Sequence, residues 1–413
     1  MNIYSKRREK LLKNFKDNAL IILFSGNAPM RSEDEAYPFC VNRNFYYLTG
    51  LEKENMALLI YKIDDVIRES LYILPFDDTL ARWVGGRMSA EEAREISEVA
   101  NVNDYSELDG AINSVMNFAR SDCSFRIYLD LWKYNPEQAP SPALVCARKL
   151  QQDYPAATIK DLYPYMAKMR LYKDEYELTC ISQAIAKTRI GIENMMKTSK
   201  PGLNEMVMEG VFDFSLMRNG CNENAFKTIC ASGERATILH YSDNDQIMND
   251  GELFLCDLGG TFKHYCADIS RTFPVNGVFS PRQREIYEIV LNAQRIVEEN
   301  AKVGVSLKEL NRMVVDYYKA ELPKHGLLED VSEYYFHGVS HHLGLDVHDI
   351  DGSKGRKLEA GMVITNEPGL YIASEGIGIR IEDDLLITGT GAVNLSKDII
   401  KEPDDIEALM KQN

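Results

Sequence analysis

Histidines are concentrated in one short segment of this chain. The run HGVSHHLGLDVHD contains His337, His341, His342 and His348, which are four of the seven histidines in 413 residues. Imidazole is the most common metal ligand in proteins, and it also transfers protons near neutral pH. This concentration therefore indicates a metal site, a proton-transfer site, or both in this part of the chain.

Carboxylates in three other segments complete a set of metal ligands. Asp257 and Asp268 belong to the run DLGGTFKHYCADISRT, Glu367 to TNEPGLYI, and Glu382 to GIGIRIEDD. Each lies in or beside an apolar stretch that favours a β-strand, where an uncompensated charge is costly. Four carboxylates and one imidazole form a mostly oxygen-donor set, which suits Mn²⁺ and tolerates Co²⁺, Zn²⁺ or Fe²⁺. Shared carboxylates would supply the negative charge that two adjacent divalent ions need between them.

The ordered set Asp257, Asp268, His341, Glu367 and Glu382 resembles the ligands of the pita-bread metallopeptidases. Within that superfamily the chain is most similar to Xaa-Pro aminopeptidase (aminopeptidase P), with prolidase next. The similar segments extend from NRNFYYLTG to GIGIRIEDD and so cover nearly the whole chain. The resemblance implies a dinuclear aminopeptidase that hydrolyses the N-terminal Xaa-Pro bond of peptides with proline at position two, using a hydroxide that bridges the metals. Two divalent ions are expected, with Mn²⁺ favoured and Co²⁺ or Zn²⁺ as alternatives.

The resemblance also implies a role for each ligand. Asp257 would chelate one metal, Asp268 and Glu382 would bridge both, and His341 and Glu367 would hold the other. Glu367 would in addition take and relay the proton of the attacking water. The alternative for each acid is a surface or helix-capping carboxylate. The spacing of Asp257 and Asp268 around the turn-forming Gly259-Gly260 predicts adjacent antiparallel strands.

The other histidines divide into three groups. Those that resemble active-site histidines, which orient the substrate and stabilise the gem-diolate, are His240, His337 and His348. Their alternative is a purely structural role. His342 replaces a bulky aromatic residue expected beside the ligand, and no role is assigned to it. His264 and His325 are predicted to lie at the surface.

Arg380 and Tyr371 are further candidates for the site. Arg380 lies two residues before Glu382, so both side chains point to the same face of an extended strand. The resemblance implies that Arg380 holds neighbouring carboxylates and the substrate side of the site. The alternative is a charge partner for Asp383 or Asp384. Tyr371 resembles a residue that lines the proline pocket, with a core tyrosine as the alternative.

One tryptophan in the N-terminal part resembles a substrate-binding residue. Trp83, one of two tryptophans, lies in ARWVGGRMS. This segment resembles one by which some aminopeptidases P send an aromatic residue into the active site of a neighbouring subunit. We therefore expect a homodimer or homotetramer. The alternative is that Trp83 packs in the core of its own domain.

The pattern of elements predicts two domains. Residues 1–165 alternate apolar runs with helical patterns, which is typical of an α/β domain, and they contain no histidine. The resemblance gives this domain a creatinase or aminopeptidase P-like role in oligomerisation and substrate access. Residues 166–413 favour helices and antiparallel strands, and the resemblance implies that they form an α+β pita-bread domain in which helices cover a curved antiparallel sheet. Capping boxes at Ser280 and Ser306 predict two helix starts there.

Composition excludes some classes of partner. The formal net charge of −16 argues against nucleic acid or an anionic membrane. No stretch approaches the roughly 20 apolar residues of a membrane span, and no signal-peptide core follows the basic MNIYSKRREKLLKN. Eight scattered cysteines without a CxxC pair predict reduced thiols in a cytoplasmic protein. Cys256 and Cys266 are predicted to pack in the core.

Two other functions fit parts of the sequence. A prolidase, which cleaves only Xaa-Pro dipeptides, would use the same ligand set, so tripeptide cleavage is needed to separate the two activities. A non-catalytic pita-bread binding protein would have lost several ligands, whereas all five are present here.

Overall fold

The computed structural model divides the chain into two compact units, Met1–Met169 and Arg170–Asn413. The sequence pattern predicts a boundary after residue 165. The structure describes residues 1–15, 17–64, 66–133, 135–351 and 355–411. Among these residues, no helix is both long enough and apolar enough to cross a membrane.

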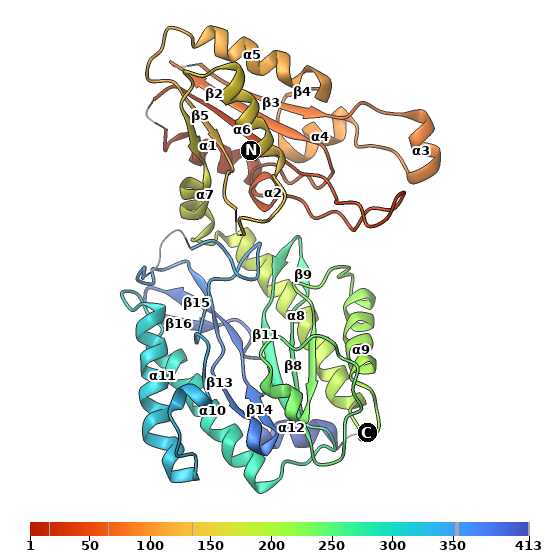
Figure 1. Cartoon of the computed structure of the whole chain (residues 1–413), viewed down its shortest axis with the longest axis vertical. Helices are drawn as coiled ribbons and strands as arrows, with labels where there is room; N and C mark the ends of the chain where they lie inside the picture. Colours follow the sequence, from red (N-terminus) through yellow and green to blue (C-terminus); the bar gives the residue numbers. More distant parts are fainter. Residues whose placement is uncertain (16, 65, 134, 352–354, 412–413) are drawn as a thin grey trace. The chain divides into compact units, whose positions relative to one another are not determined.

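Unit 1 is built on a six-stranded mixed sheet with the order β4-β3-β2-β1-β5-β6 (Figure 1). Its strands are β1 (Ala19–Phe24), β2 (Ala57–Ile63), β3 (Val66–Ile73), β4 (Asn101–Asp104), β5 (Arg126–Leu129) and β6 (Ile159–Asp161). Its helices are α1 (Ile3–Leu12), α2 (Arg43–Thr49), α3 (Asp78–Val84), α4 (Ala90–Ser97), α5 (Leu108–Phe118), α6 (Pro142–Asp153) and α7 (Tyr163–Arg170). The central β1 pairs antiparallel with β2 and parallel with β5. These features confirm the predicted α/β class.

The core of unit 1 follows from the apolar run of β1. All six of its residues are buried, as expected of a strand that is covered on both faces. Because successive side chains point to opposite faces, Leu20 and Ile22 share one face. There they belong to one cluster with Ile112 of α5 and Leu150 of α6.

Unit 2 combines antiparallel strands with long helices. The helices are α8 (Glu175–Thr198), α9 (Glu205–Arg218), α10 (Pro281–Asn300), α11 (Leu307–Glu321) and α12 (Pro403–Met410). The strands are β7 (Ile229–Ser232), β8 (Leu253–Leu258), β9 (Thr261–Phe262), β10 (Tyr265–Cys266), β11 (Ile269–Pro274), β12 (Val363–Asn366), β13 (Gly369–Ile372), β14 (Ile377–Arg380), β15 (Asp383–Thr388) and β16 (Gly391–Asn394). Short 3-10 helices of the two units occupy Tyr105–Glu107, Gly233–Thr237, Leu322–His325, Val331–Glu333 and Ala373–Glu375.

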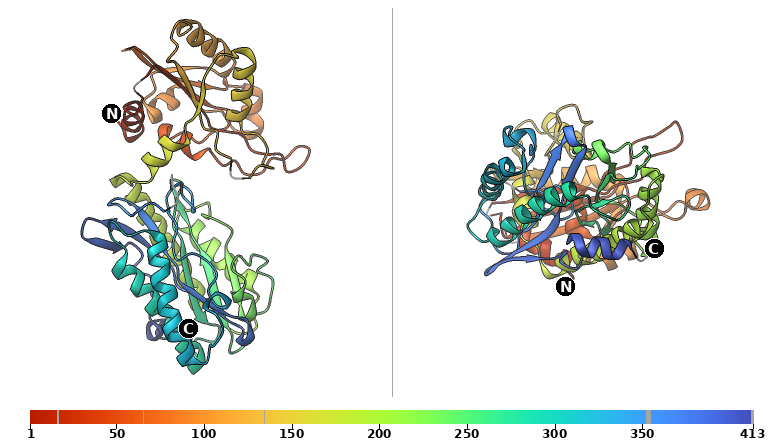
Figure 2. Two further views of the ribbon diagram at one scale, coloured as in Figure 1. Left: turned by 60° about the vertical axis from the view of Figure 1, so that its left-hand side comes forward. Right: turned by 90° about the horizontal axis from the view of Figure 1, so that it is seen from below.

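The order of elements in unit 2 repeats. The helix pair α8 and α9 precedes an antiparallel sheet of order β11-β8-β7, and the pair α10 and α11 precedes one of order β12-β15-β16. The antiparallel pairs β9–β10 and β13–β14 form two further, two-stranded sheets. In Figures 1 and 2, α9 and α11 lie on opposite sides of the unit, with strands between them. This arrangement confirms the predicted α+β class.

Both predicted helix starts in unit 2 are present. The Ser280 hydroxyl accepts a hydrogen bond from the Gln283 backbone N–H at 3.2 Å, and the Gln283 side chain accepts one from the Ser280 N–H at 2.9 Å. Ser306 and Glu309 form the same reciprocal pair. Each pair satisfies N–H groups that the first turn of a helix leaves without partners.

The strand pair β8 and β11 positions the first two predicted ligands. Asp257 of β8 lies opposite Ser270 of β11, and Asp268 comes directly before β11. This pairing confirms the predicted antiparallel arrangement. The turn requires glycine at Gly259, because a Cβ there would lie 1.8 Å from the Ala267 carbonyl oxygen.

Candidate metal centre

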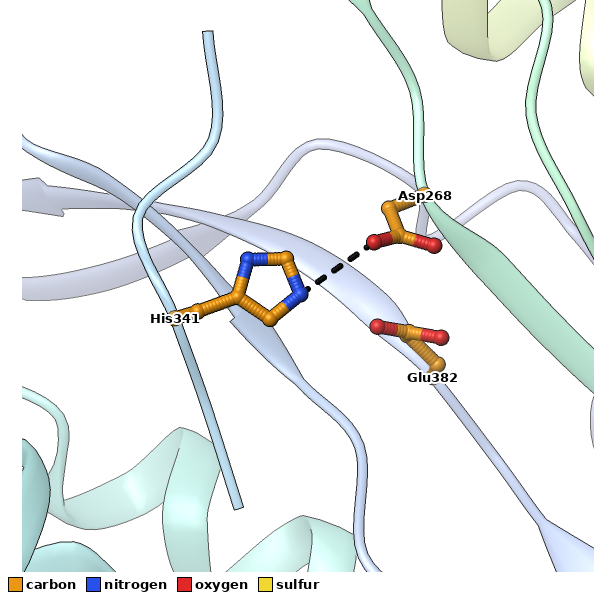
Figure 3. Close-up of side chains that lie close together, drawn as sticks. All are labelled: Asp268, His341 and Glu382. Carbon is orange, nitrogen blue, oxygen red and sulfur yellow. Dashed lines mark ion pairs between the residues drawn. The ribbon is translucent and has the colours of Figure 1, made fainter. Parts of the chain in front are cut away.

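Three predicted ligands from separate segments converge in unit 2. The ligand atoms of Asp268, His341 and Glu382 all lie within 4.8 Å of one another (Figure 3). Asp268 comes directly before β11, His341 lies in an irregular segment, and Glu382 lies between β14 and β15. His341 Nε2 is 3.3 Å from Asp268 Oδ2.

The other two predicted ligands adjoin this group. Glu367 follows β12, and its Oε1 is 3.5 Å from His341 Nε2. Asp257 Oδ2 accepts a hydrogen bond from Arg380 at 2.6 Å, whereas Oδ1 is buried without a hydrogen-bond partner in the described part of the chain. All five ligands line one cavity of about 320 Å³.

Hydroxyl groups of the strands hold these ligands in place. The Thr365 hydroxyl accepts a hydrogen bond from the His341 N–H at 3.0 Å and donates one to Glu367 at 3.2 Å. The Ser270 hydroxyl donates to Glu382 at 2.7 Å. Such bonds orient the ligand side chains before any cation binds.

The His341 ring has a defined orientation. Its Nδ1 lies 3.1 Å from the His342 carbonyl oxygen, which can only accept a hydrogen bond. In the neutral ring Nδ1 therefore carries the hydrogen, and Nε2 presents its lone pair to Asp268 and Glu367. This is the tautomer that a metal ligand needs.

The electrostatics of the cluster favour a bound cation. Burial, followed by the charges of Asp257, Asp384 and Glu367, raises the pKa of Asp268 well above its usual value. Burial and the neighbouring carboxylates raise the pKa of Glu382 in the same way. Divalent ions would relieve this repulsion, and the mostly oxygen-donor set suits them. The partnerless Asp257 Oδ1 offers a further donor, so the described residues fit the expected metals.

A hydrogen-bonded chain orients His337 at the cavity. Arg380 Nη1 donates to the Tyr371 hydroxyl at 2.9 Å, and that hydroxyl lies 2.9 Å from His337 Nε2. His337 Nδ1 lies 2.8 Å from the Gly338 carbonyl oxygen, so Nδ1 carries the hydrogen and Nε2 accepts one from Tyr371. Burial and the Arg380 charge lower the pKa of His337 to about 4. His337 is therefore neutral at physiological pH.

The other two candidate active-site histidines also line the cavity, His240 from the segment after the 3-10 helix Gly233–Thr237 and His348 from the histidine-rich segment. The rings of His348 and His341 meet edge to face, with 4.3 Å between their centroids. Burial, His341 and His240 lower the pKa of His348. The structure thus brings His348 and His240 to the same cavity as the ligands.

The alternative for Arg380 is wrong, because Arg380 pairs with Asp257. Asp383 instead pairs with Arg271 at 2.7 Å. Tyr371 is buried and is not among the described residues that line the cavity. Its hydroxyl holds Arg380 and His337, while its part in a proline pocket stays a prediction.

Trp83 lies in α3 of unit 1, and 83% of it is exposed. The alternative that it packs in the core of its own domain is therefore wrong. Its insertion into a neighbouring subunit stays a prediction.

The remaining histidines and two cysteines are not among the described residues that line the cavity. His342 is buried and pairs with Ile364 in an isolated bridge, and burial lowers its pKa to about 4. His264 and His325 are partly exposed and lie beside glutamates. Cys256 and Cys266 are buried, as predicted for core residues.

Sequence reasoning missed part of the cavity wall. The additional lining residues are Phe226, Lys227, Ile229, Leu239, Ser242 and Val347. It also missed Asp384, a buried acid that accepts a hydrogen bond from the Asp268 N–H at 3.3 Å. The adjoining carboxylates in the run IEDD were a signal for Asp384. Ile229 gave no such signal, because its exposure to the cavity depends on the pairing of β7 with β8.

The chain belongs to metallopeptidase family M24, whose pattern matches residues 179–389. Residues 4–124 match the N-terminal domain of aminopeptidase P. The Xaa-Pro aminopeptidase of Escherichia coli strain K12 is 35% identical over 441 residues, covering 98% of this chain and 97% of that protein.

Solved structures give the same result. Proline aminopeptidase P II from Yersinia pestis superimposes with a TM-score of 0.91 at 34% identity, covering 100% of both chains. Aminopeptidase P from E. coli with the inhibitor Pro-Leu superimposes with a TM-score of 0.90 at 33% identity, covering 99% of this chain and 98% of that one. These likenesses confirm the resemblance to aminopeptidase P and the pita-bread fold.

Proposed function

We propose that this protein is an Xaa-Pro aminopeptidase, a metallo-exopeptidase that releases the N-terminal residue from peptides with proline at position two. The observation that carries the proposal is the convergence of the five ligands, from Asp257 to Glu382, on one cavity. Relatives that align over nearly the whole chain are named Xaa-Pro aminopeptidase.

The expected cofactors are two divalent ions, with Mn²⁺ favoured by the oxygen-rich donor set and Co²⁺ or Zn²⁺ as alternatives. We assign Asp257 to one ion, His341 and Glu367 to the other, and Asp268 and Glu382 to both. When bound, such ions polarise a carbonyl group and lower the pKa of water towards neutrality.

The side chains around the ligands have separate tasks in this proposal. Glu367 takes and relays the proton of the attacking water, as the resemblance to aminopeptidase P implies, and its carboxylate lines the cavity with the other ligands. His337 sits beside it, with Nδ1 3.6 Å from Glu367 Oε2. His240 and His348 face the substrate from the cavity wall and orient the scissile carbonyl. Arg380 positions Asp257 and, through Tyr371, His337.

The substrate class follows from the peptide bond itself. An Xaa-Pro bond is a tertiary amide without an N–H, so an enzyme that cleaves it cannot rely on that donor. The apolar wall residues Phe226, Ile229, Leu239 and Val347 offer contact to side chains near the scissile bond. A prolidase remains the close alternative, and no observation favours it over the aminopeptidase. A non-catalytic binding protein is disfavoured, because the ligand set is complete.

Hydrolysis of three peptides tests the proposal. We expect Mn²⁺-loaded protein to release glycine from Gly-Pro-Ala and to leave Gly-Ala-Ala intact. Gly-Pro serves as the dipeptide control. Cleavage of Gly-Pro alone would make the protein a prolidase, and cleavage of none of the three would contradict peptidase activity.

We further propose a cytoplasmic location and a homodimer or homotetramer with no nucleic-acid or membrane partner. The location rests on the eight scattered cysteines without a CxxC pair, a pattern that predicts reduced thiols and so a reducing compartment. The assembly rests on the exposed Trp83.

A further inference from the structure

Lys227 is exposed and lines the cavity, just before the strand that pairs with β8. It comes two residues before β7, where Ile229 lies opposite Asp257. Because side chains alternate along an extended chain, Lys227 and Ile229 point to the same side. Both line the cavity, whereas Thr228 between them is buried and accepts a hydrogen bond from Asn224.

Asn244 forms two hydrogen bonds with the backbone that follows Lys227. Asn244 donates to the Thr228 carbonyl oxygen at 2.9 Å and accepts from the Cys230 N–H at 2.9 Å. Two residues of chain span at most about 7 Å, so the Cα atom of Lys227 lies within that distance of the Cα atom of Ile229. The lysine can therefore reach a substrate group one or two residues away from the scissile bond.

Lys227 is a cation of the cavity lining that the proposed metal centre does not use. Lys227 and Arg380 are the cations among the lining residues. Arg380 forms an ion pair with Asp257. No ion pair or side-chain hydrogen bond joins Lys227 to any of the described residues. The four lining carboxylates belong to the proposed metal centre. The nearest lining residues in sequence, Phe226 and Ile229, are apolar and cannot neutralise the ammonium group.

We propose that Lys227 forms a subsite that binds a carboxylate of the peptide substrate. This inference rests on the proposed aminopeptidase function. The carboxylate has two possible sources, the side chain of an acidic first residue or the C-terminus of a short peptide. In both cases an ammonium–carboxylate pair forms on binding, so Lys227 selects substrates and takes no part in bond cleavage.

Three peptides separate these sources in the Mn²⁺-loaded full chain. Gln-Pro-Ala amide carries no carboxylate, Glu-Pro-Ala amide carries one on the first side chain, and Gln-Pro-Ala acid carries one at its C-terminus. We expect one of the two peptides that carry a carboxylate to have a KM about fivefold below that of Gln-Pro-Ala amide. This factor corresponds to the free energy of an ion pair at a partly exposed site. The kcat of that peptide should match that of the neutral amide.

Substitutions then assign the effect to the lysine. Lys227→Met should raise the KM of the favoured carboxylate peptide about fivefold and leave the neutral amide unchanged, whereas Lys227→Arg should keep the preference. Lys302→Met is the matched control, because Lys302 is exposed and does not line the cavity. It should behave as the native protein.

Several outcomes would overturn the carboxylate subsite. Equal KM values for all three peptides would do so, as would a Lys227→Met effect of the same size on the neutral amide. If Lys227→Met does not fold, the native protein still provides a test. Raising NaCl from 50 to 500 mM should increase the KM of the favoured carboxylate peptide alone, because salt screens the ion pair. An unchanged ratio of its KM to that of the neutral amide would refute the ion pair. Failure to cleave even the neutral amide would instead refute the proposed function.

Discussion

Arg380 Nη2 donates a hydrogen bond of 2.6 Å to Asp257 Oδ2, and the other oxygen, Oδ1, is buried without a hydrogen-bond partner among the described residues. The guanidinium also donates to Ser270 and Tyr371. Ser270 in turn donates to Glu382, and Tyr371 contacts His337. One arginine thus orients two carboxylates and a histidine around the cavity, while one oxygen of Asp257 stays available to a cation.

Arg380→Lys tests this arrangement. A lysine ammonium cannot reproduce the planar fork that reaches three partners, so Asp257 and Tyr371 should lose their fixed positions. We expect kcat/KM to fall about 10- to 100-fold, as for other residues that orient metal ligands. Steady-state kinetics and metal analysis measure the change. Arg284→Lys, at an exposed ion pair with Glu288, is the control, and native activity in Arg380→Lys would refute the positioning role.

Asp268→Asn tests the bridging assignment. The substitution keeps the shape but removes one negative charge, so the remaining ligands should hold the two dications poorly. We expect hydrolysis to be abolished and bound metal to decrease, as measured by elemental analysis. Chelation of the native protein should likewise abolish activity and lower the melting temperature, with recovery on adding Mn²⁺. Full activity with two bound metals in Asp268→Asn would exclude the bridging role of Asp268.

His348→Ala separates catalysis from metal binding. We place His348 beside the reacting carbonyl, and loss of one such donor in other enzymes costs on the order of 10²–10³ in turnover. The expected result is therefore a large fall in kcat with nearly unchanged metal content. His325→Ala is the control, because His325 pairs with Glu285 and lies outside the cavity lining. Metal loss parallel to the loss of activity would make His348 a ligand.

A buried ion pair anchors the segment that carries His348. Arg170 Nη2 is 2.5 Å from Asp349 Oδ1, and Lys173 Nζ is 2.9 Å from Oδ2. Burial alone would raise the pKa of Asp349, but the Arg170 and Lys173 charges outweigh it and lower that pKa. Because the pKa is lower in the folded chain, the ionised carboxylate stabilises the fold above its unfolded pKa of about 3.9. This stability is lost as the pH falls through the folded pKa.

Asp349→Asn should therefore lower the free energy of unfolding at pH 7 by roughly 3–5 kcal/mol, because it removes the buried carboxylate that pairs with both Arg170 and Lys173, and of these two only Arg170 keeps an ion pair with Asp346. The difference from the native protein should shrink below about pH 4. Urea unfolding at pH 7, 5 and 3 measures both effects. Asp346→Asn is the control; Asp346 also pairs with Arg170 but is 43% exposed, so its contribution is screened. An equal difference at every pH would contradict this account.

The sequence predicted those features that depend on local residue types. The Ser280 and Ser306 helix starts follow from contacts within one turn. The proposed carboxylate ligands stood out because a charge in a strand-like apolar run is costly without a partner, whereas the choice of His341 among the histidines came from the resemblance to the pita-bread metallopeptidases. The Arg170–Asp349 pair and the cavity position of Lys227 join residues whose proximity depends on tertiary packing. No local pattern encodes them, which is why sequence reasoning missed them.

Trp83→Ala tests whether subunits share their active sites. Trp83 is 83% exposed within its own chain, so its removal should leave the melting temperature nearly unchanged. If the ring forms an apolar wall for proline in a neighbouring subunit, kcat/KM should fall about tenfold or more, the size of a lost hydrophobic contact in a binding pocket. Trp132→Ala is the control, because Trp132 is also exposed but stacks on Tyr163 of its own chain. Light scattering should show a dimer or tetramer at assay concentration. A fully active monomer, or native kcat/KM in the oligomeric Trp83→Ala variant, would exclude the shared site.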